Sequence, residues 1–489
     1  MTVAPETLVL LALLAPLAGA LLIPLFRNRP NLRETVTLSA AGALLAFVIG
    51  LLGPVADGAR PELHLANIAP GLSLAFKVEP LGMLFALVAS SLWIVNSVYA
   101  IGYMRAEQEP RQTGFYVCFA LALGSTIGVA FAKNLFTLFL CYEALTLSTY
   151  TLVTHKRGEA AMRAGRIYLL LLLGTSLVLF LPAILATWAI AGTLDFTSGG
   201  VLAGKASAVT IGLLLALFVF GIGKAALMPV HFWLPAAMVA PTPVSALLHA
   251  VAVVKAGVFC IAKIVLYIFG LDTLAASGAN TWLIYLAAGV ILLASLIALA
   301  QDNLKARLAY STISQLAYVV LGAAFATTTG LLGSAVHIAA HAAGKITLFF
   351  CAGAIYVATH KTNVSELDGI GRAMPYTMFA FLLGSLSIIG IPPLAGFWSK
   401  WYLGITAFET DHLVVLCILL LSSVLNVGYL LSIVGRAFFL PPRDGDAAIA
   451  GIREAPLLCV VPLCLTALAC VALFFGIDSI RSLLAGALP

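Results

Sequence analysis

The segment GKAALMPVHFWLPAAMVAPTPVSALLHAVAVVK, from Gly223 to Lys255, decides how this chain folds. It lies in the middle of an apolar sequence, yet it holds two lysines, two histidines and four prolines. Proline removes a backbone donor and clashes with the carbonyl four residues earlier, so the helix that carries Lys224 must break or kink. At membrane depth, freed carbonyls are tolerated where they face protein or a water-filled cavity. The segment predicts a titratable amine beside a hydrated helix break; the alternative is a packing kink whose lysine reaches the membrane surface.

The composition around this segment is that of a polytopic membrane protein. Of the 489 residues, 62% are hydrophobic and 9% are charged, whereas a soluble domain has about 25% charged residues. About fourteen stretches reach the ~20 residues that span a bilayer, and they are continuously apolar, which favours helices over a barrel. The first stretch lacks a preceding basic region and a cleavage site, which indicates a retained helix. The predicted spans are 7–26, 34–55, 80–103, 113–132, 134–154, 167–191, 207–232, 241–270, 281–300, 308–326, 330–358, 374–408, 412–438 and 455–477.

The basic residues outside these spans alternate between the two sides of the membrane. One set of connections holds sixteen: Arg27, Arg29, Arg33, Arg105, Arg111, Lys156, Arg157, Arg163, Arg166, Lys305, Arg307, Lys361, Arg372, Arg436, Arg443 and Arg453. The other set holds five: Arg60, Lys77, Lys133, Lys205 and Arg481. The positive-inside rule places the first set in the cytoplasm and both termini outside. These loops explain the net charge of +6 without a surface for nucleic acid.

Five lysines remain within predicted helices: Lys224, Lys255, Lys263, Lys345 and Lys400. A charged side chain at depth costs at least ~2.5 kcal/mol, so a functional role is the default expectation, except that Lys263 is as well explained by a nearby helix end. Glu143, in CYEALTLSTY, is the one acid in its span. A buried carboxylate needs a cation, and Lys224 is its natural partner if their helices pack together.

A second break follows the same pattern in SLSIIGIPPLAGFWSKWYL, residues 385–403. Pro392 and Pro393 interrupt a helix, and Lys400 follows within two turns. Paired interrupted segments in two halves of a chain are typical of transporters built from repeats. Lys224 and Lys400 are therefore predicted to be equivalent residues.

Histidines and lysines also recur at helical spacing in HIAAHAAGKITLFF, residues 337–350. His337, His341 and Lys345 fall at i, i+4 and i+8 and line one stripe of a helix. Histidine titrates near neutrality, which favours a proton relay. The alternatives are polar packing between helices and a metal site. A metal site would require a further ligand close to the two histidines. His249 and Lys255 are six residues apart and are not expected to share a face.

Several chemistries have no motif in the sequence. A Walker-type phosphate loop, a dinucleotide-binding glycine pattern and cysteine spacing for haem or iron–sulfur ligation are all missing. The eight cysteines form no CxxC pair and lie mostly in apolar helices, where small buried side chains are expected. We therefore predict no cofactor, no metal and no redox or hydrolytic centre in this chain, whose status as an enzyme stays open.

Four segments together resemble the antiporter-like membrane subunits of respiratory complex I, membrane-bound hydrogenases and Mrp-type cation/proton antiporters. They are CYEALTLSTY, the segment from Gly223 onward to Phe259, HIAAHAAGKITLFFCAGAI and GIPPLAGFWSKWYL, and the resemblance covers roughly residues 80–440. It implies an all-α integral membrane fold of about fourteen helices with two inverted five-helix repeats and broken helices 7 and 12. The implied units are residues 1–112 for helices 1–3, 113–270 and 281–438 for the repeats, and 455–489 for helix 14 and the C-terminus.

The resemblance also implies roles for particular residues. Glu143 matches the acid of the fifth helix, Lys224 matches the lysine of the broken seventh helix, and Lys400 matches the terminal residue of the broken twelfth, which is Glu in one complex I member. The remaining matches are His249 and Lys255 in the eighth helix and His337, His341 and Lys345 in the eleventh. The length of the chain and the segment GKITLFFCAGAI are most like those of the Mrp D subunit. This likeness implies Na⁺/proton exchange in the bacterial inner membrane, in a complex with other membrane subunits. A proton-pumping subunit of a redox complex is the alternative, and a self-sufficient transporter of a small solute is a third possibility.

Overall fold

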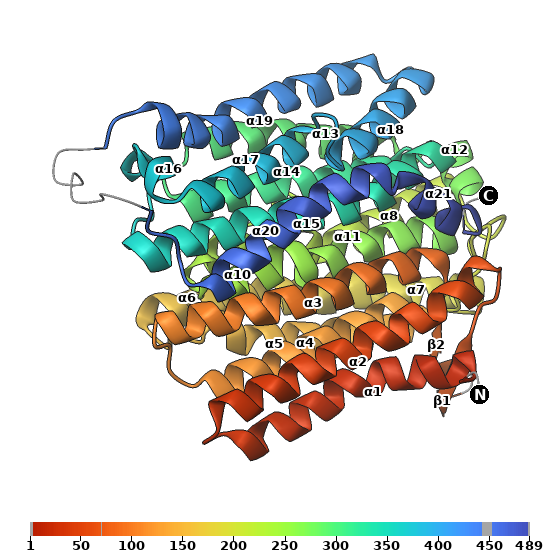
Figure 1. The fold of residues 1–489 in the computed structure, drawn as a ribbon. Coiled ribbons are helices and arrows are strands. Elements are labelled where there is room, and N and C mark those ends of the chain that lie inside the picture. The colour runs from red at the N-terminus through yellow and green to blue at the C-terminus, as the bar shows by residue number, and fades with distance from the viewer. Residues whose placement is uncertain (1–2, 70, 443–451, 488–489) are drawn as a thin grey trace.

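The computed structural model describes residues 3–69, 71–442 and 452–487. Arg443, one of the predicted cytoplasmic basic residues, lies outside these ranges, as do the outermost residues of the predicted terminal units. The described chain is mostly helical and forms one bundle of roughly parallel and antiparallel helices (Figure 1). Within it, eleven helices are long and apolar enough to cross a membrane, and two shorter apolar helices accompany them. This confirms a multi-pass helical membrane protein, while the count of fourteen spans and the inverted repeats stay predictions.

The helices follow the apolar stretches of the sequence closely. The first part of the chain forms α1 (Pro5–Leu22) with the 3₁₀ turn η1 (Ile23–Phe26), α2 (Pro30–Ala56), α3 (Pro80–Ala106), α4 (Gln112–Phe131), α5 (Leu135–Val153), and α6 (Glu159–Thr175) continued by the π-turn η2 (Ser176–Phe180) into α7 (Leu181–Ala191). The last part forms α12 (Leu271–Ser277), α13 (Thr281–Ala300), α14 (Leu304–Ala324), α15 (Thr328–Thr359), η7 (Val364–Glu366), α16 (Ile370–Ala373), α19 (Leu413–Phe439), α20 (Leu457–Phe475) and α21 (Ile477–Ala485).

Both predicted helix breaks are present. After α8 (Ala208–Gly221) the chain forms η3 (Gly223–Ala225), α9 (Trp233–Ala236) and η4 (Ala237–Val239), and a long helix resumes with α10 (Thr242–Ala246), η5 (Leu247–Val251), α11 (Val253–Ile264) and η6 (Val265–Phe269). The second break separates α17 (Pro375–Ile389) from α18 (Gly396–Glu409). The prolines lie in the interruptions or in the first turn of a helix, as Pro235 does in α9 and Pro243 in α10, where a missing backbone donor is tolerated.

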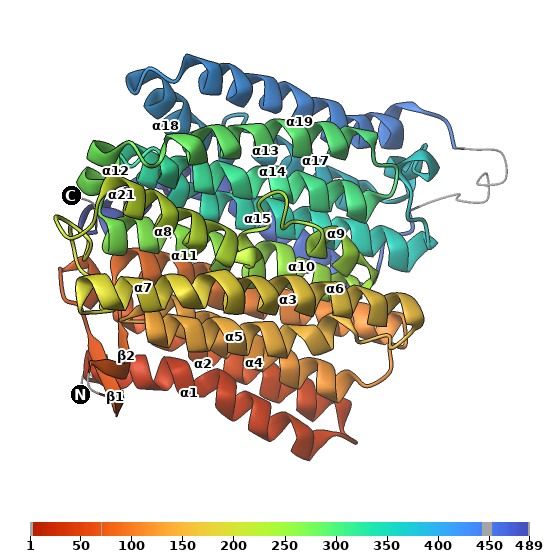
Figure 2. The same ribbon diagram turned by 180° about the vertical axis from the view of Figure 1, so that it is seen from behind.

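The centre of the bundle is formed by the helices that carry the unusual polar residues. Every residue in the apolar window of α15 is buried, and the same holds for the span Thr242–Phe269. By contrast, about a third of the corresponding windows in α1 and α2 is buried. Figures 1 and 2 show α15 and α11 in the middle, with α1 and α2 at one edge and α18 and α19 at the other. Polar groups in the central helices therefore face protein rather than lipid.

A β-hairpin lies between two of the helices and was not predicted. Strands β1 (Glu62–Ala69) and β2 (Leu72–Lys77) pair antiparallel between α2 and α3. The hairpin lies at the same end of the bundle as both marked chain ends (Figure 1). Arg60 confirms this placement, because its Nη2 donates to the carbonyl of Gly486 over 2.8 Å. Polar and apolar residues alternate at the start of β1, from Glu62 to Leu65, a pattern that membrane-length apolar windows do not detect.

Candidate functional site

Lys224 lies directly after the end of α8, at the first helix break. The side chain is fully buried. Its Nζ donates to the carbonyl of Tyr142 over 2.9 Å and to Thr146 Oγ1 over 2.5 Å, and it lies 3.1 Å from the centre of the Tyr142 ring. Tyr142 and Thr146 are one turn apart on α5, so the amine reaches a single stripe of that helix.

The broken backbone around Lys224 is satisfied by two aromatic side chains. The Lys224 N–H donates to the Tyr142 hydroxyl over 3.2 Å, and Trp233 Nε1 donates to the carbonyl of Gly223 over 3.0 Å. Helix α11 crosses here at Gly257, where an added Cβ would collide with the amide nitrogen of Ala225. The break is thus held from both sides by neighbouring helices, as a non-helical segment in a membrane requires.

Glu143 does not form the expected pair with Lys224. Both of its carboxylate oxygens are buried without a hydrogen-bond partner among the described residues, and no ion pair joins it to Lys224 there. Adjacent residues of a helix project about 100° apart, so an amine that binds at Tyr142 and Thr146 meets a different face of α5 from Glu143. Glu143 follows Tyr142, whose carbonyl binds Lys224, so the two residues are near each other without a hydrogen bond or ion pair between them among the described residues.

The predicted stripe of α15 forms a connected set with neighbouring helices. The rings of His337 and His341 lie nearly parallel with centroids 5.8 Å apart. Lys255 Nζ of α11 lies 2.6 Å from His341 Nδ1, and His337 Nδ1 lies 2.8 Å from the hydroxyl of Ser399 in α18. All of these side chains are buried. Three helices therefore bring four polar side chains into one line across the centre of the bundle.

Lys345 ends the stripe on the same helix. Its Nζ donates to Ser311 Oγ over 2.6 Å and to the carbonyl of Leu308 over 3.3 Å, both on α14. The i, i+4, i+8 spacing therefore places His337, His341 and Lys345 on one face, as predicted, although that face meets different helices along its length.

His249 and Lys255 were not expected to share a face, and the structure contradicts this. Both meet α15: the His249 ring lies 4.5 Å from that of Phe349, and Lys255 contacts His341. The π-turn Leu247–Val251 and the irregular backbone of Ala252 (φ −113°, ψ −73°) lie between them and change their relative rotation. Neither ring nitrogen of His249 has a hydrogen-bond partner in the described chain.

Lys400 lies one turn inside α18, after the second break. Its Nζ donates to the carbonyl of Ile389, the last residue of α17, over 2.9 Å and to Ser423 Oγ over 3.1 Å. It also lies 5.0 Å from the centre of the Tyr318 ring, and the ring of His337 stacks on the same Tyr318 ring with centroids 5.5 Å apart. Lys400 is half-buried and lines a cavity of about 800 Å³ between α18 and α19. It therefore connects the line of side chains in the centre to an open edge of the bundle.

Several residues of the site were not predicted from the sequence. The hydroxyl groups of Thr146, Ser311, Ser399 and Ser423 all bind predicted site residues. Such groups are common in membrane helices because they bond their own backbone, so their presence alone indicates nothing. Only the packing of helices distant in sequence selects these four.

Lys263, whose role was left open, has a specific partner. Its Nζ lies 3.3 Å from Glu79 Oε2 and donates to the carbonyl of Ala132 over 2.7 Å, and both charged side chains are buried. Glu79 precedes α3 at the hairpin end of the bundle. Among the described residues, no three His, Cys, Asp or Glu side chains gather into a group that would hold a metal ion.

The sequence matches the model of a protein family over more than half of its length. Residues 132–426 match the family described as "NADH:quinone oxidoreductase/Mrp antiporter, TM". The chain is 31% identical to NADH-quinone oxidoreductase subunit N of Desulforudis audaxviator, over 99% of this chain and 98% of that protein. It is also 31% identical to hydrogenase-4 component B of Escherichia coli, over 93% of this chain and 71% of that protein. The same identity holds for one component of the probable K⁺/H⁺ antiporter of Rhizobium meliloti, over 84% of this chain and 40% of that protein.

Two solved structures have the same fold. A chain of the Mrp complex from Dietzia sp. superposes with a TM-score of 0.88 at 23% identity, covering 99% of this chain and 96% of that chain. A chain of the archaeal membrane-bound sulfane sulfur reductase superposes with a TM-score of 0.86 at 23% identity, covering 98% and 96%. Together with the family match, these similarities show that the chain belongs to the family of NADH:quinone oxidoreductase and Mrp antiporter membrane subunits.

Proposed function

We propose that this chain is the proton-translocating subunit of a multisubunit Na⁺/proton antiporter and carries protons along its buried lysines and histidines. The observation that carries the proposal is the continuous line from Lys255 through His341 and His337 to Ser399, with Lys400 beside it at the bundle edge. Groups that titrate and lie within hydrogen-bond or stacking distance are what proton transfer requires. Within such an antiporter, we propose that the chain corresponds to the Mrp D subunit.

A second candidate is a proton-pumping subunit of an NADH-quinone oxidoreductase or a membrane-bound hydrogenase. It is favoured by the match to subunit N, which covers almost the full length of both chains. In either case the solved relatives of this fold lie in multisubunit membrane complexes, which supports partner subunits for this chain. Purification of a tagged chain from its native membrane distinguishes the two, because a redox complex brings subunits that hold redox centres.

The test of proton translocation uses the complete complex in sealed vesicles with a pH-sensitive dye. Lys224→Met and Glu143→Gln each remove one buried charge, and we expect either to reduce coupled proton flux by about a hundredfold, the lower range for loss of a positioned proton-transfer group. Lys205→Met is the matched control, because Lys205 is exposed on the connection before α8. Assembled complexes with near-normal flux in the Lys224 and Glu143 variants would contradict the proposal.

A further inference from the structure

A cavity of about 710 Å³ lies at the end of the bundle opposite the hairpin, where α2 and α4 begin and α3 ends. Its polar lining consists of Arg29, Asn31, Arg105, Gln108 and Gln112. The charge pattern of the connections assigns this end to the cytoplasm. The cavity is remote from the central lysines and histidines, and the proposed transport does not use it.

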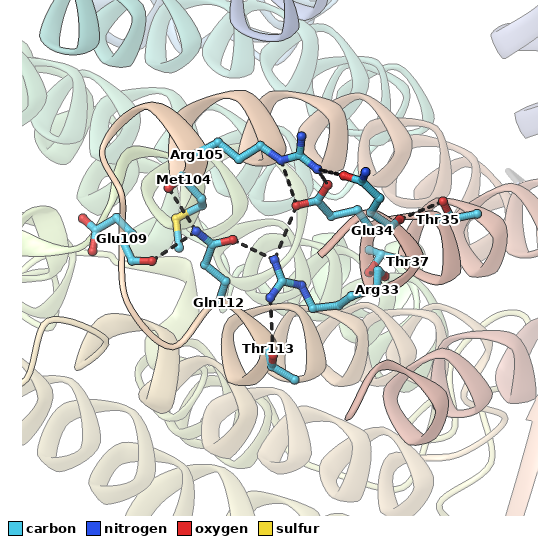
Figure 3. A network of polar contacts seen from close by, with 10 residues as sticks. Arg33, Glu34, Thr35, Thr37, Met104, Arg105, Glu109, Gln112 and Thr113 are labelled. Carbon is cyan, nitrogen blue, oxygen red and sulfur yellow. Dashed lines mark hydrogen bonds and ion pairs between the residues drawn. The ribbon is translucent and has the colours of Figure 1, made fainter. Parts of the chain in front are cut away.

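A network of arginines forms one wall of this cavity (Figure 3). Glu34 forms ion pairs with both Arg33 and Arg105, and Arg105 Nη2 also donates to Asn31 Oδ1 over 2.6 Å. Arg33 Nη2 donates to Gln112 Oε1 over 2.7 Å. One carboxylate is thus shared by two guanidinium groups, so the network keeps a net positive charge.

The positive charge is on the open side of the network. The Arg105 side chain is 44% exposed, whereas the Glu34 side chain beneath it is 5% exposed. Arg29 adds a second exposed guanidinium to the lining. Helix α2 begins at Pro30, so the positive end of its dipole adds to the same field. An anion with oxygen acceptors fits this environment.

An apolar groove of about 420 Å³ continues from the cavity between α1 and α2. The cavity residues Asn31 and Leu32 lie one turn before Thr35 and Val36, which begin the groove on the same face of α2. The groove reaches Phe47, twelve residues after Thr35, which corresponds to ~18 Å along the helix. One leaflet of the hydrocarbon core is ~15 Å deep, so the groove is long enough to hold one acyl chain along its length.

We propose that this site binds an anionic phospholipid of the cytoplasmic leaflet, with its phosphodiester in the arginine cavity and an acyl chain in the α1–α2 groove. Charge complementarity favours the lipid over a helix from another protein of the complex. An apolar helix would fill the groove but would leave the Arg29 guanidinium and the excess positive charge of the Arg33–Glu34–Arg105 network without a matching anion. Basic pockets between helices on this side of a membrane are suited to such headgroups.

The test uses the full-length chain, purified in detergent, stripped of lipid and titrated with phosphatidylglycerol. Native mass spectrometry should detect one bound lipid per chain, and phosphatidylcholine should bind about tenfold more weakly because its headgroup has no net charge. Arg29→Gln should weaken phosphatidylglycerol binding about fivefold, as loss of one basic residue near the surface predicts. Arg27→Gln removes the same charge outside the cavity and should leave binding unchanged.

A second pair of variants tests the groove. Ala43→Trp fills it and should weaken lipid binding, whereas Ala46→Trp places the same side chain on an exposed position of α2 outside the groove and should not. Equal binding of the two lipids, equal effects of the two arginine variants, or no effect of Ala43→Trp would each overturn the proposal. So would displacement of the lipid by inorganic phosphate, which would indicate a small-anion site. A protein helix in the groove of the assembled complex would overturn it as well.

Discussion

At the scale of single residues, three lysines of the site share one pattern of hydrogen bonds. Each ammonium binds one backbone carbonyl and one hydroxyl, and none pairs with a carboxylate among the described residues: Lys224 with Tyr142 and Thr146, Lys345 with Leu308 and Ser311, and Lys400 with Ile389 and Ser423. Lys263 differs, because it has a carboxylate partner in Glu79, and a carboxylate partner favours the charged form of an amine. Without one, the neutral amine still has two N–H groups for these two acceptors, so the proton can leave without breaking an ion pair.

The Lys400→Arg variant tests whether Lys400 releases a proton. Arginine keeps the positive charge but stays protonated at any working pH. We therefore expect proton flux in reconstituted vesicles to fall by about a hundredfold. Lys205→Arg, the same change at an exposed position, should have no effect. Wild-type flux with arginine at position 400 would identify Lys400 as a fixed charge that does not carry protons.

At the scale of the elements, the two breaks are stabilised by side chains that supply the missing backbone partners. Trp233 donates to the carbonyl of Gly223 at the first break, and Lys400 donates to the carbonyl of Ile389 at the second. Prolines open these segments, and the donors prevent buried carbonyls from being left without a partner. The breaks are consequently defined structures that position lysines.

The Trp233→Phe variant tests this stabilisation at the first break. It keeps most of the buried aromatic volume but removes the donor to Gly223, so we expect the free energy of unfolding to fall by about 1–3 kcal/mol. Thermal unfolding of the detergent-solubilised chain measures the change. Trp188→Phe, on an exposed side of α7, is the control and should unfold as the wild type does. Equal stability of both variants would mean that water replaces the tryptophan as donor.

A carboxylate also joins two connections at the predicted cytoplasmic end. Asp302 accepts hydrogen bonds from Ser365 Oγ over 2.7 Å and from the Ser365 N–H over 2.9 Å. These bonds hold the pKa of Asp302 below its ordinary value. A lowered pKa means that the ionised form stabilises the fold above the ordinary pKa, and that this contribution is lost as pH falls through the lowered value.

The Asp302→Asn variant should therefore be less stable than the wild type at pH 7, and the difference should shrink at about pH 3, as pH falls toward the lowered pKa of Asp302. The effect should be small, at most about 1 kcal/mol, because Asp302 is exposed to solvent. Melting temperatures at the two pH values measure it, with Asp57→Asn at an exposed helix end as the control. A difference that persists at low pH would show that packing, and not charge, is responsible.

At the scale of the whole molecule, the bundle places the hairpin and the marked chain ends together and the basic connections at the opposite end (Figure 1). The arrangement agrees with the alternation of charge along the sequence. The central helices α11 and α15 hold the polar line, and outer helices surround them (Figure 2). The proposed route therefore takes protons through protein along the centre and releases them at the α18–α19 edge.

Orientation in the membrane can be tested by labelling introduced cysteines in a variant without the native ones. A membrane-impermeant maleimide should label His64→Cys in the hairpin on intact cells, because the charge rule places the hairpin outside. Arg163→Cys, at the start of α6, should react only after the cells are permeabilised. Both positions are exposed, so accessibility to the reagent is matched. The reverse result would invert the predicted topology.

The sequence by itself determined the class of structure and the places where helices break. Long apolar segments can satisfy their backbone in lipid only as helices, and in these two segments each proline lies in an interruption or in the first turn of a helix. Helical spacing likewise put His337, His341 and Lys345 on one face. These properties depend on residues close together in the chain, so they can be derived without knowledge of the packing.

Only the tertiary structure decided which polar groups meet. Lys224 binds Tyr142 and Thr146 and does not bond to Glu143. Lys255 of α11 contacts His341 of the neighbouring helix α15. Spacing fixes the face of a helix on which a residue lies, but the rotation of one helix against another fixes its partner. That rotation follows from the packing of many side chains distant in sequence, including hydroxyl and glycine residues that carry no local signal.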